Sequence, residues 1–135
     1  MAAIKNIDDL LKQMSPRLNE GEFVFVHSDN DALLKDPDLI GFFREKEGPT
    51  FIFPRDKAEK LGLDYDFIAS WISLDVHSAL DAVGLTAAFS TCLAEEGISC
   101  NVVAAFHHDH IFVDRKDAQR AVKLLHTFSN KSADH

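Results

Sequence analysis

The sequence is short of cysteine, of positive charge and of long apolar runs. Its two cysteines, Cys92 and Cys100, are too few for a secreted disulfide framework and match no zinc motif, so we predict that both are reduced. The 14 Lys and Arg residues face 22 Asp and Glu residues, a net charge of −8, which argues against nucleic acid or an anionic membrane as the main partner. The longest uncharged run, residues 82–94, falls short of the roughly 18 residues that a membrane span needs.

The N-terminal residues also lack the apolar stretch of a secretory signal, because Lys5, Asp8 and Asp9 interrupt it. We therefore expect a cytoplasmic protein. The chain has 135 residues, 46% of them hydrophobic, which is enough to bury a core without disulfides or metal ions.

Apolar spacing predicts alternating helices and strands. Ile4, Ile7, Leu10, Leu11 and Met14 recur at helical spacing until Ser15-Pro16 ends the pattern. The remaining predicted elements, in chain order, are strands at 23–26, 39–43 and 50–53, a helix from 54 to about 62, a strand at 67–76, a helix at 85–93 closed by Gly97, strands at 100–106 and 111–113, and a helix at 118–128 capped by Asp114.

The second half of the chain repeats the first at an offset of 60 residues. Residues 51–60 (FIFPRDKAEK) align with residues 111–120 (IFVDRKDAQR), so that aromatic, basic and alanine positions coincide. The connection from Val26 to Leu39 is much shorter than its counterpart in the second copy, which indicates that the first copy has lost its first helix. The second copy reads β-α-β-β-α and lacks a last strand.

This order predicts an α+β fold made of two fused, incomplete copies of the ferredoxin-like β-α-β-β-α-β unit, each with an antiparallel sheet. We expect a strand of the first copy, residues 23–26, to fill the open edge of the second sheet. The predicted division is residues 1–66 for the N-terminal helix and degenerate first copy, 67–128 for the second copy, and 129–135 for a polar tail.

Two stretches resemble the ACT domain, namely residues 82–88 (AVGLTAA) and residues 93–103 (LAEEGISCNVV). In that family a glycine opens the first helix, a second glycine closes it, and an apolar-Asn-apolar element begins the second strand. The resemblance is closest to small stand-alone proteins with two ACT-like units. It implies a regulatory or sensor protein, a homodimer, and allosteric binding of an amino acid or related metabolite between paired units.

The resemblance places the ligand near the loop before the first helix and the start of the second strand. A helix N-terminus at Gly84 offers unpaired N–H groups to an α-carboxylate, Asn101 can donate and accept hydrogen bonds, and Asp75 or Asp81 could meet an α-ammonium group. Gly84 could instead serve a turn, Asn101 a structural hydrogen bond, and both aspartates a charged surface. The candidate binding residues are Asp75, Asp81, Val83, Gly84, Leu85, Thr86, Cys100, Asn101 and Val102.

A different class of function is suggested by the run His107-His108-Asp109-His110, together with His77. Imidazole and carboxylate groups bind transition metals, which would suit a metal-assisted hydrolase. Neighbouring residues of a strand point to opposite faces, however, and no Cys or Glu recurs nearby at ligand spacing, so a polar hairpin turn is the simpler explanation of the run. No nucleophile motif is present, so we favour a non-enzymatic, cofactor-free binding protein. A structural subunit that associates through its sheet edge is a third hypothesis.

Overall fold

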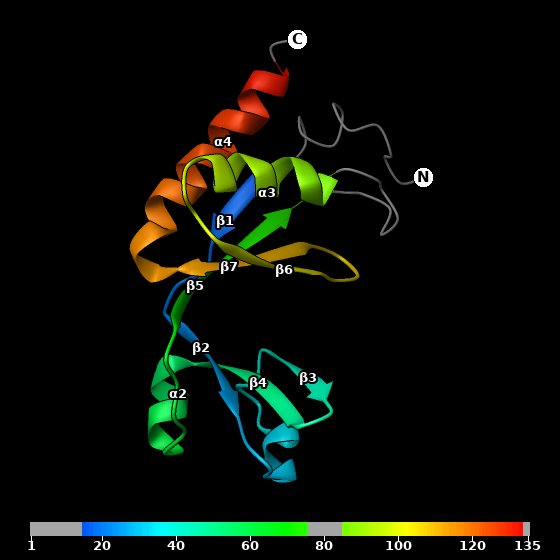
Figure 1. Ribbon diagram of the computed structural model, residues 1–135, viewed down its shortest axis with the longest axis vertical. Coiled ribbons are helices and arrows are strands. Elements are labelled where there is room, and N and C mark those ends of the chain that lie inside the picture. Colours follow the sequence, from blue (N-terminus) through cyan, green and yellow to red (C-terminus); the bar gives the residue numbers. More distant parts are fainter. Residues whose placement is uncertain (1–14, 76–84, 134–135) are drawn as a thin grey trace. The chain divides into compact units, whose positions relative to one another are not determined.

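The computed structural model describes residues 15–75 and 85–133, and the chain divides into two compact units (Figure 1). Unit 1 is formed by Met1–Asn19 and Trp71–His135, and unit 2 by Glu20–Ser70. The helix predicted at 4–14 lies outside the described residues. The chain therefore enters unit 1, forms unit 2, and returns to unit 1.

Unit 1 is an antiparallel sheet with two helices on one face (Figure 1). Its strands lie in the order β1-β5-β7-β6. Its elements are β1 (Ser15–Leu18), β5 (Ile68–Asp75), α3 (Leu85–Glu95), β6 (Cys100–Ala104), β7 (Asp109–Asp114), the 3-10 helix η2 (Arg115–Asp117) and α4 (Ala118–Ala133). Counted from β5, this is the β-α-β-β-α-β plan, and β1 takes the place of the last strand.

The strand that completes unit 1 is thus β1, and our expectation that residues 23–26 would do so was wrong. β1 runs antiparallel to β5, with Ser15 opposite Asp75 and Leu18 opposite Ile72. Residues 23–26 are occupied in unit 2, where they pair with β4 on one side. Pro16 is compatible with β1 because an edge strand can do without one backbone donor.

Unit 2 repeats the same strand order with a shorter helical layer. Its elements are β2 (Phe23–His27), the 3-10 helix η1 (Asp31–Lys35), β3 (Gly41–Glu45), β4 (Gly48–Pro54) and α2 (Arg55–Lys60). The strands lie in the order β3-β4-β2, followed by the beginning of β5. Only η1 stands where unit 1 has α3, which confirms the predicted loss of the first helix.

The strand β5 belongs to both units. Its first residues, Ile68 and Ala69, pair with Val24 and Phe23 in unit 2, and its later residues pair with β1 in unit 1. One strand is therefore the last of one ferredoxin-like unit and the first of the next.

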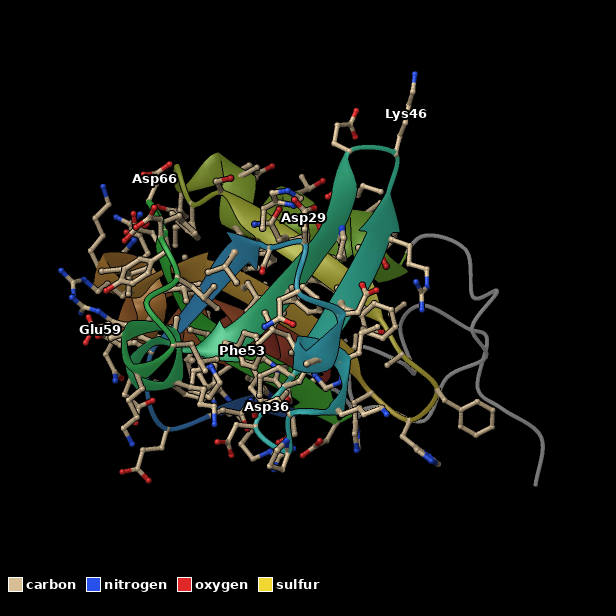
Figure 2. The ribbon with its side chains drawn as sticks, turned by 90° about the horizontal axis from the view of Figure 1, so that it is seen from below. Asp29, Asp36, Lys46, Phe53, Glu59 and Asp66 are labelled. Carbon is tan, nitrogen blue, oxygen red and sulfur yellow. The ribbon has the colours of Figure 1, made fainter. Side chains whose placement is uncertain are left out.

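Each unit has its own apolar core. In unit 1, alternate residues of β5 and β7 face the helices, and the buried set is Ile72, Leu74, Phe89, Leu93, Ile98, Ile111, Val113, Ala121 and Leu125. In unit 2 the buried set is Val24, Val26, Leu33, Phe51, Phe53 and Ala58. Figure 2 shows Phe53 within unit 2, whereas Lys46 extends from the tip of the β3–β4 hairpin. As predicted, Gly97 follows α3 with a φ of 75°, a value that favours glycine.

Candidate functional site

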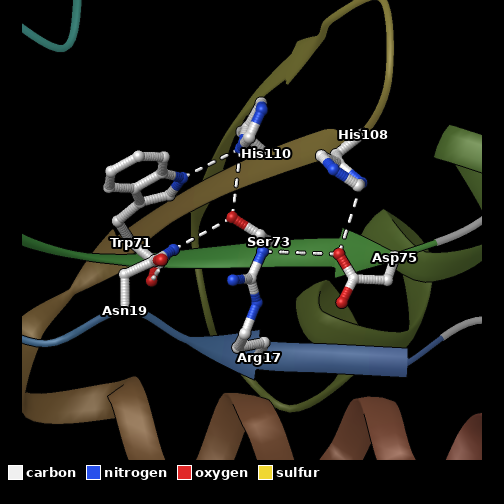
Figure 3. Close-up of polar contacts among 7 residues, drawn as sticks. All are labelled: Arg17, Asn19, Trp71, Ser73, Asp75, His108 and His110. Carbon is white, nitrogen blue, oxygen red and sulfur yellow. Dashed lines mark hydrogen bonds and ion pairs between the residues drawn. The ribbon is translucent and has the colours of Figure 1, made fainter.

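The helix-free face of the unit 1 sheet carries a group of connected polar side chains. Because side chains alternate along a strand, Ile72 and Leu74 of β5 face the helices, while Trp71, Ser73 and Asp75 lie on the other face. Figure 3 shows these three residues with their neighbours from β1 and from the β7 side of the sheet. Ser73 is buried, whereas Trp71 and Asp75 are half-buried, so among the three residues of β5 only Trp71 and Asp75 remain partly open to solvent.

Three contacts fix which residues of β5 and β7 are neighbours. The rings of Trp71 and Phe112 stack with centroids 6.0 Å apart. Ser73 Oγ lies 3.2 Å from His110 Nδ1. Asp75 Oδ1 lies 3.3 Å from Nδ1 of His108, just before β7 begins. The polar groups therefore follow β5 toward its end at Asp75.

His110 is held as a neutral imidazole. The indole Nε1–H of Trp71 donates to His110 Nδ1 over 3.0 Å, and an indole N–H can only donate, so Nδ1 carries no proton. Burial lowers the pKa of His110, and the charge of His108 lowers it further. Asn19 steadies the network from the β1 side, because its Nδ2 donates to Ser73 Oγ over 2.9 Å. The second ring nitrogen of His110 points away from Trp71 and Ser73 (Figure 3).

A charged group lies at the end of β5. Arg17 Nη2 lies 3.4 Å from Asp75 Oδ1, the oxygen that also faces His108. All three side chains remain open to solvent, with exposed fractions of 57% for Arg17 and 43% each for Asp75 and His108. The group therefore presents a guanidinium and a carboxylate side by side, together with the imidazole of His108.

The structure separates the predicted binding residues into two places. Asp75 ends β5, and Leu85 and exposed Thr86 begin α3, with nine residues between the two elements. Asn101 is exposed on β6 and pairs with Phe112, four residues from His108 along the chain. At about 3.3 Å per residue, Asn101 lies about 13 Å further along the sheet than Asp75.

The other predicted residues have simpler placements. Cys100 and Val102 pack against the unit 1 core, and Cys100 Sγ lies 3.9 Å from Ser90 Oγ of α3. Asp81, Val83 and Gly84 lie outside the described residues. Sequence reasoning missed Arg17 and Asn19, because Ser15-Pro16 was interpreted only as the end of a helix and the residues after it carry no strand pattern. The spacing of Ser73 and Asp75 along the predicted strand was the one available signal for this face.

The residues of the histidine run lie in different surroundings. Asp109 is buried, and its pKa is raised by that burial, whereas His107 is exposed at the hairpin turn. Within residues 15–75 and 85–133, no three His, Cys, Asp or Glu side chains are grouped as metal ligands. His77 lies outside these ranges. Nothing in the described part of the chain supports the hydrolase hypothesis, and none of its helices is long and apolar enough to cross a membrane.

Two models of the ACT domain match the chain, one over residues 2–70 and the other over residues 67–127. A Vibrio cholerae protein of unknown function, described as a possible transport protein, is 44% identical, with a TM-score of 0.83, and the match covers 93% of this chain and 97% of that one. No protein of curated function matches the sequence.

More distant solved structures share the fold. An Agrobacterium tumefaciens protein is 16% identical, with a TM-score of 0.66 and coverage of 87% of this chain and 90% of that one. The ligand-free regulatory subunit of aspartate kinase from Thermus thermophilus is 10% identical, with a TM-score of 0.62 and coverage of 83% and 94%.

Proposed function

Because the chain belongs to the ACT-domain family, whose domains bind small molecules and regulate, we propose that it is a cytoplasmic sensor whose ligand is a small amino acid. The observation that carries this proposal is the half-exposed pair of Arg17 and Asp75 at the end of β5. An amino acid is a zwitterion, and this pair offers one partner to each of its charges.

In the proposed complex, Asp75 binds the α-ammonium group, and Arg17 binds the α-carboxylate. Arg suits a carboxylate because its planar guanidinium can donate two parallel hydrogen bonds. The first backbone N–H groups of α3, at Leu85 and Thr86, have no partner within the helix and offer further donors. Roles for Asp81, Val83 and Gly84 in the preceding loop remain predictions.

A homodimer would give the residues at the start of β6 a role in the proposed site, namely Cys100, Asn101 and Val102. β6 is an edge strand of five residues without a charged side chain, so it lacks the usual protection against pairing. A two-fold axis between two copies of β6 makes the strands antiparallel, so the partner's β6 would begin toward the end of the sheet where Asp75 lies. Both places of the predicted site would then meet across two copies.

A screen of the twenty amino acids by thermal shift tests the proposal. A ligand at 100 times its Kd adds about 2.7 kcal/mol to the free energy of unfolding, which shifts the melting temperature measurably. We expect Asp75→Asn and Arg17→Gln to weaken binding about tenfold or more by removing one charged partner. Arg44→Gln, an exposed arginine of β3, is the matched control and should bind like the wild type. No shift with any amino acid at millimolar concentration contradicts the proposal.

The dimer-dependent part has its own test. Asn101→Leu should weaken ligand binding while the apo melting temperature holds, because Asn101 is exposed and a structural role would instead lower that temperature. Light scattering of the wild type should report twice 15.1 kDa. A monomer at high concentration would remove Asn101 from the site and leave the pair of Arg17 and Asp75 to be tested alone.

A further inference from the structure

The contacts of His110 fix which of its two ring nitrogens carries the proton. Its Nδ1 faces the indole N–H of Trp71 at 3.0 Å and Ser73 Oγ at 3.2 Å, so Nδ1 is an acceptor. The hydroxyl of Ser73 is free to donate to Nδ1, because Asn19 Nδ2 already donates to its oxygen. A neutral imidazole has a single N–H, which must therefore lie on Nε2.

This Nε2–H is a hydrogen-bond donor that is not used in the described part of the chain. The hydrogen bonds of the His110 ring there all go to Nδ1, and Figure 3 shows Nε2 on the side of the ring away from Trp71 and Ser73. The side chain of Val103, which lies opposite His110 on β6, has no acceptor. Because His110 is only half-buried, a bound molecule can reach this nitrogen.

The donor lies close to the charged pair of the proposed site. Ser73, which contacts His110, precedes Asp75 by two positions on β5 and lies on the same face of the sheet. Two residues of a strand span about 6.6 Å, and one hydrogen bond accounts for about 2.9 Å of this distance. About 3.7 Å then separates the α-carbon of a ligand bound at Asp75 from its acceptor atom, the reach of three covalent bonds.

We propose, on the basis of the proposed function, that the ligand is an amino acid with a side-chain amide, asparagine or glutamine, and that His110 Nε2 donates to the amide oxygen. This oxygen lies three bonds from the α-carbon in asparagine and four in glutamine, whereas the hydroxyl of serine lies only two bonds away. A side-chain carboxylate fits less well, because Arg17 binds the α-carboxylate and the chain has a net charge of −8.

The fixed donor provides specificity against apolar side chains. Leucine has nearly the same shape as asparagine but no acceptor, so its binding would cover the Nε2–H of His110 and leave it without a partner. A covered donor without a partner costs more than a missing hydrogen bond on an open surface. The site should therefore distinguish these two amino acids although both carry the same α-ammonium and α-carboxylate groups.

Calorimetric titration with asparagine and with leucine tests the proposal. The single tryptophan, Trp71, gives a second signal, because its ring centroid lies 5.5 Å from that of His110. The wild type should bind asparagine about tenfold more tightly than leucine. His110→Phe removes the donor and should bring the two Kd values within about twofold of each other. His126→Phe replaces an exposed histidine of α4 and is the matched control, expected to keep the wild-type ratio.

A conservative variant distinguishes a donor from a merely structural ring. His110→Gln places an amide N–H near the position of Nε2 and should restore part of the preference for asparagine. A structural role for His110 would instead weaken the binding of asparagine and leucine alike and leave the ratio of their Kd values unchanged. Circular dichroism confirms that each variant is folded.

The outcomes separate this inference from the proposed function. Equal affinity of the wild type for asparagine and leucine overturns the inference and leaves the charged pair of Arg17 and Asp75 in place. A preference for asparagine that persists in His110→Phe also overturns it, and so does tighter binding of aspartate or glutamate than of the amides. Failure of every amino acid to bind contradicts the proposed function, and the inference with it.

The proton on His110 can also be located without a variant. NMR spectra of the histidine ring nitrogens distinguish a protonated nitrogen from an unprotonated one. We expect the proton on Nε2, and we expect asparagine to shift the Nε2 resonance more than leucine does. A proton found on Nδ1, or equal shifts with both ligands, overturns the proposal.

Discussion

Units 1 and 2 have the same strand order but differ between their first two strands. Unit 1 has the 11-residue α3 there, and unit 2 has the five-residue η1, of which only Leu33 is buried. The core of unit 2 relies instead on Phe51 and Phe53, whose rings lie 6.1 Å apart and are fully buried. A ferredoxin-like unit can thus lose a helix when large side chains fill the space beneath it.

The two units differ as much on their other face. At the 60-residue offset, His108, His110 and Phe112 of unit 1 correspond to Gly48, Thr50 and Ile52 of unit 2. Gly48 could not carry a histidine, because its φ is 122° and an added Cβ would come within 2.6 Å of the ring of His27. The candidate site therefore has no counterpart in unit 2, although the backbone plan is repeated.

The largest expected effect tests whether the units unfold together. Phe53→Ala should lower the free energy of unfolding by about 3–5 kcal/mol, because it removes a fully buried ring. The single tryptophan, Trp71, lies in unit 1 and the single tyrosine, Tyr65, in unit 2, so fluorescence and near-ultraviolet circular dichroism follow them separately. We expect both transitions to shift together, since β5 serves both sheets. A shift of the Tyr65 transition alone would show that the units are independent.

A smaller effect on stability should distinguish the start of η2 from the start of α2, which the repeat aligns. Asp114 accepts a hydrogen bond from the Lys116 backbone N–H over 3.1 Å, whereas Pro54, its counterpart 60 residues earlier, offers no side-chain cap. Asp114→Ala should cost about 1 kcal/mol in urea unfolding. Lys116→Ala is the control and should change stability little, because its exposed side chain is not the cap.

A pH effect should come from unit 1. The folded-state pKa of His110 is lowered, so below about pH 6.5 the unfolded chain binds a proton that the folded chain does not. Stability should therefore be full above that pH and fall as the pH drops through the folded pKa. The slope should stay below the roughly 1.4 kcal/mol per pH unit of one whole proton. His110→Gln should flatten it in urea titrations, and an unchanged slope would assign it to another group.

The smallest expected effect belongs to unit 2. Lys57 Nζ lies 3.1 Å from Asp36 and 3.5 Å from Asp38, which ties α2 to the turn after η1. Lys57→Met should lower the melting temperature only slightly, because the pair with Asp36, although its side chains are only 25% and 13% exposed, still borders water and is partly screened by it and by salt. The difference from wild type should vanish in 1 M salt. A difference that persists there would mean that packing of the lysine stem matters more than its charge.

The sequence predicted the repeated elements well, because their signals are local. The apolar runs of β2 and β4, the glycine after α3 and the cap at Asp114 act within a few residues of themselves. β1 could not be predicted in this way. Its four residues, Ser-Pro-Arg-Leu, contain no strand pattern, and they become a strand only because the edge of β5, more than 50 residues away, is open to them.

The candidate site was likewise predictable only where its residues carry a local signal. Asp75 follows from its place at the end of a predicted strand, whereas Arg17 depends on the pairing of β1 and could not be seen. The neutral state of His110 depends on one indole donor from another strand, which no spacing along the chain reveals. The domain boundaries at 66 and 128 and the roles of the residues in loop 76–84 remain predictions.

The double membership of β5 has a consequence for how such a chain can evolve. A domain whose strands pair only with one another can be gained or lost by recombination without breaking any strand pairing. Here any junction between the copies leaves β1 on one side and its partner strand on the other. A fragment that begins at residue 67 keeps α3 and α4 but leaves the edge of β5 unpaired. It would need β1, which lies in the other fragment, to complete its sheet. Cutting the chain between the two copies would therefore separate β1 from β5.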